Sequence, residues 1–462
     1  MSTSAGRPTG PGWRVESWRI LVGLVSVTVL ILGLYRQVAP QPYQAPDFSH
    51  TYRASQALRD GSDLYAPALS WVETYQLGQP LTNQYFYAPT YALLLTPLTF
   101  LPYQAAIAVW GGCLLVFLCV AVYALFRSTG PPPSLVLVLV VAAVASLMSA
   151  VRAEYFLGQA NLFMLACICT AIWARQAERP GLAGIFLALA LVTKPMLLLI
   201  SAYLLWKREF KFALTTIAGF LVLLLTPFLW LGRNVLANLL TLWHFYSTQY
   251  LSFSENIAPR GMLERLFTVN PFVRPLVDMP VLAVALWLVI SGMIFIITLA
   301  VIAPRPFRRE SRSLIELGVM LSGLLLVSPL TEPPYLVLLI MPLVGTLIYL
   351  RGVQWNQPPF RWAALALGGL WGLELIPRKY TEDVIARLPH ADPFQAALFV
   401  ILVPTHFYIL LATFGLQLHL LHLASGSTTR DALDRFVRNS PMLVGDWLTD
   451  LLAARTVSRD GR

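Results

Sequence analysis

The sequence predicts an all-α polytopic membrane protein with about twelve transmembrane helices, or eleven to thirteen at the limits. Of its 462 residues, 57% are hydrophobic and only 12% are charged, whereas soluble domains average about 25% charged residues. This composition excludes a soluble enzyme, a disordered chain and a disulfide scaffold. The net charge of +10 indicates membrane sidedness rather than a nucleic-acid partner, because cytoplasmic loops collect Lys and Arg.

Apolar runs recur along the chain at about the 20 residues that a helix needs to cross a bilayer. The first run follows a polar tail and precedes no small-x-small cleavage site, so we expect an uncleaved helix rather than a signal peptide. The apolar runs are 20–35, 104–126, 134–151, 155–174, 212–231, 281–303, 314–331, 335–350, 362–377 and 394–418.

Two carboxylates, Glu316 and Glu374, lie inside these predicted spans, and the sequence suggests no role for them.

Two further segments leave the topology open. In one count, 87–101 is a re-entrant or interfacial half-helix and 181–206 is a pair of short helices that turn at Lys194-Pro195. In the other count, 87–101 crosses the membrane and 181–206 is one kinked span. Each count gives about twelve crossings. The positive-inside rule favours the first count, because it leaves more arginines in the cytoplasm. Those arginines are Arg127, Arg175 and Arg179.

The favoured topology divides the chain into a membrane domain and two cytoplasmic tails. The C-terminal tail has helical amphipathic spacing, which is typical of a segment lying on the membrane surface. The expected parts are the tail 1–19, the membrane domain 20–418 with outer loops 36–86, 232–279 and 378–393, and the tail 419–462.

The first outer loop contains a short predicted interfacial helix that begins near Asp47. Phe48, Tyr52 and Ser55 fall on one face of it. Asp47 is of the type that caps a helix N-terminus, and Gly61 is of the type that follows a helix C-terminus. From the residues alone, Asp47 is therefore a helix cap.

Neither a metal site nor a cofactor site is expected. The four cysteines lie in apolar runs, where we expect no disulfide, and the six histidines are scattered without ligand spacing. The sequence has no Asp-x-Asp pair, no glycine-rich phosphate loop and no nucleotide-binding motif.

Six short motifs, each weak alone, occur in a fixed order across residues 47–336. Together they resemble glycosyltransferase family 87, the polyprenyl-phosphate-sugar-dependent membrane glycosyltransferases that include bacterial α-mannosyltransferases. The chain departs from the family at the last motif, where Glu332 and two prolines stand in place of Trp-Asp-His. The motifs are Asp47-Phe48 with Tyr52, Gly61 and Leu64-Tyr65; Phe86-Tyr87-Ala88-Pro89; Gly158-Gln159-Ala160-Asn161-Leu162; Gly184 with Lys194-Pro195; Asn256 with Arg265-Leu266; and Ser328-Pro329-Leu330.

The resemblance implies a C-type glycosyltransferase architecture in the plasma membrane. It also implies inverting transfer of a sugar, with mannose favoured, from a polyprenyl phosphate to an acceptor hydroxyl on the extracytoplasmic side. The implied partners are the lipid-linked donor, a glycolipid or glycan acceptor and membrane lipid, without nucleic acid, metal or cofactor. The alternatives are a secondary transporter or lipid-linked sugar flippase, and an enzyme similar to O-antigen ligases or polymerases.

The implied reaction needs a base, cations for the leaving phosphate and groups that bind sugar. Asp47 is the expected general base, with Glu332 and Glu154 as possible second carboxylates. The expected phosphate ligands are Arg265, Arg260 and Lys194. The expected sugar or acceptor ligands are Tyr52, Tyr87, Gln159, Asn161 and Asn256.

Each of these residues also has a purely structural interpretation. The two arginines can be solvated loop charges, and Lys194 can be a lysine that snorkels from a helix end. Gln159 can join helices by hydrogen bonds, an interpretation that we favour for this residue. The tyrosines can belong to the aromatic belt at the membrane interface.

Overall fold

The computed structural model describes residues 12–38, 45–74, 84–302, 311–353, 357–376 and 392–425. These ranges are helical apart from turns and short extended segments. The first half contains α1 (Gly12–Val38), α2 (Pro46–Arg59), α3 (Ala66–Thr74), α4 (Pro89–Leu95), η1 (Thr96–Phe100), α5 (Tyr103–Thr129), α6 (Leu135–Ser146), α7 (Ser149–Leu157), α8 (Asn161–Gln176), α9 (Pro180–Leu191), η2 (Pro195–Leu198), α10 (Leu199–Trp206) and α11 (Phe210–Leu225). The second half contains α12 (Phe228–Leu231), α13 (Arg233–Gln249), α14 (Pro259–Phe267), α15 (Pro280–Val301), α16 (Ser311–Val327), η3 (Pro333–Leu339), α17 (Ile340–Gly352), α18 (Pro358–Leu373), α20 (Pro393–Leu402) and α21 (Thr405–Ser425).

Within the described ranges, six helical segments are long and apolar enough to cross a membrane. A seventh arises if α6 and α7, which are bent by 81° to one another, count as one span. The chain is therefore an all-helical, multi-pass membrane protein, but the structure does not show the twelve crossings that the apolar runs predict. The six segments are Trp18–Tyr35, Tyr103–Thr129, Phe210–Leu231, Pro280–Val301, Pro333–Gly352 and Thr405–Ala424.

Several predicted runs are broken by residues that end helices. The run 394–418 is two helices, α20 and α21, because Pro404 lies between them and a proline lacks the N–H that continues a helix. The boundary predicted at 152–154 is wrong, because α7 runs through it and the chain instead breaks before Ser149 and after Leu157. The segment 181–206 forms separate short helices on either side of Lys194, as in the favoured count.

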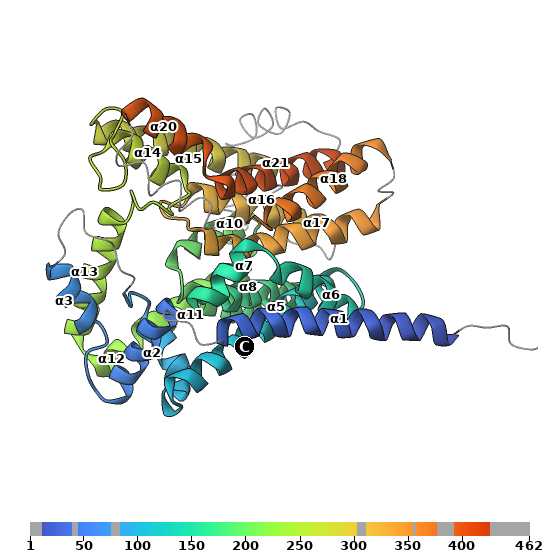
Figure 1. The fold of residues 1–462 in the computed structure, drawn as a ribbon, viewed down its shortest axis with the longest axis horizontal. Coiled ribbons are helices and arrows are strands. Elements are labelled where there is room, and N and C mark those ends of the chain that lie inside the picture. Colours follow the sequence, from blue (N-terminus) through green and yellow to red (C-terminus); the bar gives the residue numbers. More distant parts are fainter. Residues whose placement is uncertain are drawn as a thin grey trace, which may run out of the picture.

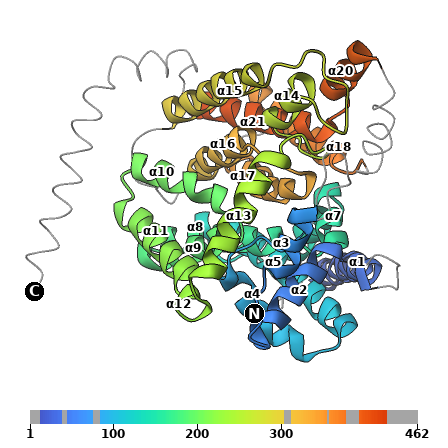
Figure 2. The same cartoon turned by 90° about the vertical axis from the view of Figure 1, so that its left-hand side faces the viewer.

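The helices form two groups along a common axis. Figure 1 shows long helices such as α1, α5, α17 and α21 running along the longest axis, with α2, α3, α12 and α13 gathered at one end. Seen from that end in Figure 2, α1 to α9 lie in one group and α14 to α21 in the other, with α13 across the front. The segments expected in the first two outer loops thus share one end of the molecule. Of the expected third loop only residues from 392 onward are described, and the predicted tail beyond 425 lies outside the described residues.

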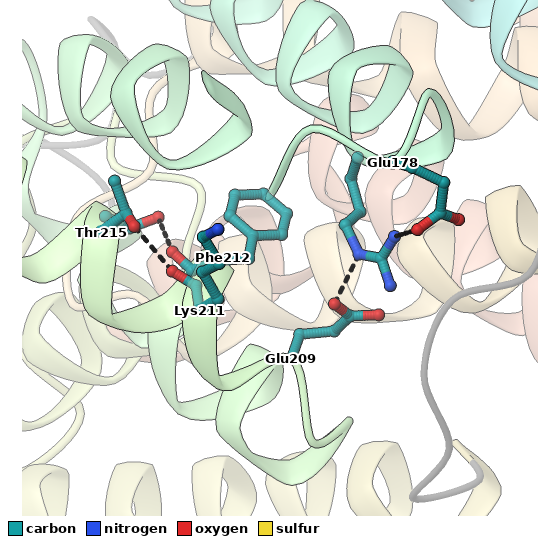
Figure 3. Close-up of polar contacts among 7 residues, drawn as sticks. Glu178, Glu209, Lys211, Phe212 and Thr215 are labelled. Atoms are coloured by element: carbon teal, nitrogen blue, oxygen red, sulfur yellow. Dashed lines mark hydrogen bonds and ion pairs between the residues drawn. The ribbon is translucent and has the colours of Figure 1, made fainter. Parts of the chain in front are cut away.

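Buried ion pairs join helices near the turns that connect α8 to α9 and α10 to α11. Arg175 bonds Glu209 through Nε at 2.5 Å and Glu178 through Nη1 at 3.3 Å; Figure 3 shows Glu178 and Glu209 on either side of the guanidinium. Lys207 Nζ lies 2.7 Å from Glu316 Oε2, and both side chains are buried. Glu316, a carboxylate for which the sequence suggested no role, therefore compensates a buried lysine.

Replacing Glu316 by leucine should destabilise the protein strongly, because Lys207 would stay buried without its counter-ion. Breaking a buried pair in this way typically costs about 3–5 kcal/mol. Glu178→Leu is the matched control, since the Glu178 side chain is 86% exposed and exposed pairs contribute about 0–1 kcal/mol. Thermal unfolding in detergent should show a large drop in Tm for Glu316→Leu alone. Equal Tm values for the two variants would contradict the assigned role.

Candidate active site

A pocket opens where the two helix groups meet α13, and its walls come from parts of the chain far apart in sequence. Contributions come from α2, the extended segment before α4, the turn between α7 and α8, α13, and the segment that leads into η3. Its lining is mainly aromatic and polar. The residues are Asp47, His50, Thr51, Gln84, Tyr85, Phe86, Tyr87, Gln159, Tyr246, Tyr250, Leu330, Glu332 and Tyr335.

Asp47 lies in the first turn of α2 and is 9% exposed. The helix begins one residue earlier than expected, at Pro46, and Ala45 stands at the cap position without a side-chain cap. One oxygen of the Asp47 carboxylate, Oδ2, accepts a hydrogen bond from Gln159 Nε2 at 2.5 Å. Asp47 is therefore not the N-cap that its sequence position suggested, and its carboxylate lines the pocket.

The turn after α7 can approach α2 because it contains a glycine. Gly158 has a φ of 70°, and a Cβ added there would lie 2.7 Å from Phe48 Cβ and 3.0 Å from Ala45 Cβ. Its carbonyl oxygen accepts a hydrogen bond from Trp110 Nε1 at 3.0 Å. Because Gly158 has no side chain, the turn can lie close to α2, and the following residue, Gln159, can reach Asp47.

A chain of side-chain hydrogen bonds fixes the orientation of Gln159. The Asn161 amide donates to Gln159 Oε1 and to Glu154 Oε2, both at 2.7 Å. Glu154 is fully buried and also accepts from the Leu162 backbone N–H at 3.0 Å. Because the Gln159 oxygen is occupied by Asn161, its NH2 group points to Asp47. The structure thus brings four sequence-predicted residues into one network, of which Asp47 and Gln159 line the pocket.

Lys194 is buried between α9 and η2, and is 7% exposed. Its ammonium lies 2.9 Å from the centre of the Tyr335 ring, and its Nζ has no hydrogen-bond partner among the described residues. Burial disfavours the charged form of this amine, whereas the negative charges of Glu332, Glu154 and Asp47 favour it. Since Tyr335 lines the pocket, the cation lies directly behind the pocket wall.

Asn256 joins the loop after α13 to the segment that carries Glu332. Its amide donates to the carbonyls of Leu251 and Pro329, both at 2.9 Å. Its Oδ1 accepts from the backbone N–H of Ala258 and of Thr331, both at 3.1 Å. Fully buried, Asn256 does not line the pocket and instead fixes the backbone just before Glu332.

The two predicted arginines lie behind this loop and do not line the pocket. Arg265 donates to the carbonyls of Phe253 at 2.6 Å and Asn256 at 3.0 Å. Burial lowers the pKa of Arg265 to about 10, so it remains cationic at neutral pH. Arg260 pairs with Glu264 and lies 5.1 Å from the centre of the Trp287 ring.

The aromatic residues divide between the pocket and its support. Tyr87 lines the pocket, whereas Tyr52 packs behind it and donates to the Leu101 carbonyl at 2.8 Å. Burial raises the pKa of Tyr87 well above its usual range, so this phenol stays protonated. Sequence reasoning missed His50, Tyr246 and Tyr250 as lining residues. The spacing of Tyr246 and Tyr250, one helical turn apart, was the available signal for the last two.

The far end of α7 is held by the C-terminal helices. Ser149 Oγ lies 2.8 Å from His406 Nε2 and donates to Glu374 Oε2 at 3.1 Å. The Ser149 backbone N–H donates to the Glu374 carbonyl at 2.5 Å. Glu374, the second carboxylate for which the sequence suggested no role, is therefore bonded at the N-terminus of the helix that precedes Gly158.

The family model described as Glycosyltransferase family 87 matches residues 85–329, which is more than half of the chain. The chain belongs to glycosyltransferase family 87. No curated protein and no solved structure gives a significant match. Membership makes this protein a membrane glycosyltransferase, with a sugar donor and an acceptor as its substrates. The matched range of this family 87 glycosyltransferase includes Tyr87, Gln159 and Lys194, whereas Asp47 and Glu332 lie outside it.

Gly158→Ala should disrupt the pocket, because the new methyl group would meet Phe48 in a backbone conformation that disfavours L-residues. Gly61→Ala is the matched control: Gly61 also has a positive φ, of 72°, but no heavy atom lies within 4 Å of an added Cβ. The strain alone costs about 1–2 kcal/mol. Thermal unfolding and sugar transfer should both be impaired more by Gly158→Ala than by Gly61→Ala. Equal losses would show that the close approach to α2 has no importance.

Proposed function

We propose that this glycosyltransferase transfers a sugar, with mannose favoured, from a polyprenyl phosphate to an acceptor hydroxyl with inversion, and that Asp47 is the general base. The observation that carries the proposal is the Asp47 carboxylate, which lines the pocket and is oriented by Gln159 from a distant segment. The acceptor is a glycolipid or glycan. The absence of nucleotide-binding motifs in the sequence supports a lipid-phosphate donor.

The hydrogen bond from Gln159 suits the role of a base. It occupies one of the roughly four lone-pair sites of a carboxylate and fixes the direction of the others. A carboxylate so oriented can accept the proton of an acceptor hydroxyl at hydrogen-bond distance. In this proposal the acceptor oxygen attacks the anomeric carbon, while the carbon–oxygen bond to the phosphate breaks on the opposite face.

The leaving polyprenyl phosphate gains negative charge and needs a cation nearby. Lys194 is our first candidate, because a lysine ammonium has three donors, and among the described residues its Nζ has a ring contact but no hydrogen-bond partner. Its Nζ lies against the ring of Tyr335, which lines the pocket. Arg265 and Arg260 remain candidates at a second rank, since their guanidinium groups contact neighbouring backbone, Glu264 and Trp287.

The remaining predicted residues divide into sugar contacts and supports. We propose Glu332 and Tyr87, which line the pocket, as partners for sugar hydroxyls. Glu154, Asn161 and Asn256 would act indirectly, through the hydrogen bonds that orient Gln159 and the backbone before Glu332. Tyr52 would support α2.

The pocket is proposed to face the extracytoplasmic side of the plasma membrane. The elements that form it gather at the end of the molecule where α2, α3 and α13 lie (Figure 1). The turn between α10 and α11 contains the basic residues Lys207 and Arg208, and the positive-inside rule assigns such a turn to the cytoplasm. Family membership favours transfer over transport or lipid flipping.

Asp47→Asn should strongly reduce transfer while leaving the fold intact, because asparagine keeps the size of the side chain but cannot accept the proton. General base catalysis contributes about 10²–10⁴-fold, so we expect a loss in that range in a membrane assay with labelled polyprenyl-phosphate sugars. Asp60→Asn, an exposed change at the other end of α2, is the control. Undiminished transfer by Asp47→Asn would exclude Asp47 as the base, and a panel of donor sugars in the wild type would test mannose.

Lys194→Met should lower kcat far more than it raises the KM for the donor, because the cation is needed most when the phosphate departs. Losing one such electrostatic group typically costs about 10²–10³ in kcat. Lys194→Arg should retain part of the rate, and Arg265→Met should mainly lower Tm by releasing the 253–256 loop. If Lys194→Met kept full kcat, the phosphate role would pass to the arginines.

A further inference from the structure

A histidine that no motif assigns lies in the same pocket as Asp47. His50 is three residues further along α2, so the two side chains are neighbours on one face of the helix. Both line the pocket. His50 is partly exposed, whereas Asp47 is buried. The imidazole is thus the more solvent-accessible of the two adjacent titratable groups.

Several charged or titratable groups surround this imidazole. Asp47 and Arg53 flank it on its own helix, and Glu332 faces the pocket from the segment before η3. Five tyrosines come from the segment before α4, from α13 and the residue after it, and from η3. They are Tyr85, Tyr87, Tyr246, Tyr250 and Tyr335.

The imidazole has a pKa suited to gaining and losing a proton. Burial lowers the pKa of His50 below its usual 6.5, Asp47 raises it, and Arg53 lowers it. His50 is therefore neutral at pH 7 and can accept a proton. Because the folded-state pKa is lowered, this capacity is present above it and is lost as the pH falls through it.

The proposed reaction leaves a proton on Asp47 that must depart before the next turnover. When the acceptor O–H bond breaks, its electron pair forms the bond to the sugar, and the polyprenyl phosphate leaves with the electron pair of the broken glycosidic bond. The diester monoanion becomes a monoester dianion, so one proton is released. With Asp47 only 9% exposed, direct loss to water is hindered.

We propose that His50 is the proton outlet of this site, accepting the proton from Asp47 and releasing it to solvent at the mouth of the pocket. The proposal rests on the proposed function, since it needs Asp47 to act as base. The neighbouring tyrosines cannot replace it, because burial raises the pKa of Tyr87, Tyr246 and Tyr250 and keeps them protonated. The Gln159 amide does not titrate.

The test compares His50→Ala and His50→Gln with wild type in the full-length protein. We expect kcat to fall at least about tenfold in both, with the KM for the donor within about twofold. Added imidazole should restore kcat in His50→Ala but not in Asp47→Asn, because a small base can replace the outlet but not the oriented carboxylate. His244→Ala is the control, since His244 is an exposed histidine on α13 that does not line the pocket.

The outcomes separate this proposal from the one on which it rests. Wild-type kcat in His50→Ala, full activity in His50→Gln, or a raised donor KM without rescue by imidazole would each overturn the proton outlet. The last result would assign His50 to donor binding instead. Full activity in Asp47→Asn would overturn the base itself, whatever the His50 variants do.

Discussion

The hydrogen bond from Gln159 to Asp47 is the contact on which the organisation of this pocket depends. It joins the first turn of α2 to the turn between α7 and α8, which are 112 residues apart. Two conditions make it possible. Gly158 allows the turn to approach the backbone of α2, and Asn161 occupies the Gln159 oxygen so that the NH2 group faces the carboxylate.

This contact also explains why sequence reasoning met its limit at Asp47. The pattern around it correctly predicts a helix with Phe48, Tyr52 and Ser55 buried on one face, and Gly61 in the left-handed conformation just beyond its end. The same pattern suggested a cap, because local sequence reports on local backbone. The true partner of the carboxylate comes from another part of the chain, and only the resemblance to a family indicated a chemical role.

Other features of the fold also divide into those that the local sequence predicts and those that depend on contacts between distant segments. The class of fold, the break at Lys194 and the short helices after Tyr87 could be read from apolar runs and prolines. The division of 394–418 at Pro404 could have been read in the same way. The number of crossings could not, because length and hydropathy do not distinguish a spanning helix from a short buried one. The positions of His50, Tyr246 and Tyr250 in the pocket wall could not be predicted either. They depend on how distant helices pack together, and the local pattern of one segment does not contain that information.

The attachment of α7 to Glu374 has a consequence for the order in which the enzyme is assembled. Glu374 follows Ser149 by 225 residues. The helix α7 therefore leaves the ribosome long before Glu374 and His406, which bond its first residue, have been synthesised. Chains are made from the N-terminus onward, and contacts between distant segments form late. The helix that leads to Gly158 and Gln159 therefore gains its final support only after α18 and α21 have been inserted. A nascent chain that already contains Asp47, Glu154, Gln159 and Asn161 would still lack this support, so the final arrangement of the pocket depends on completion of the membrane domain.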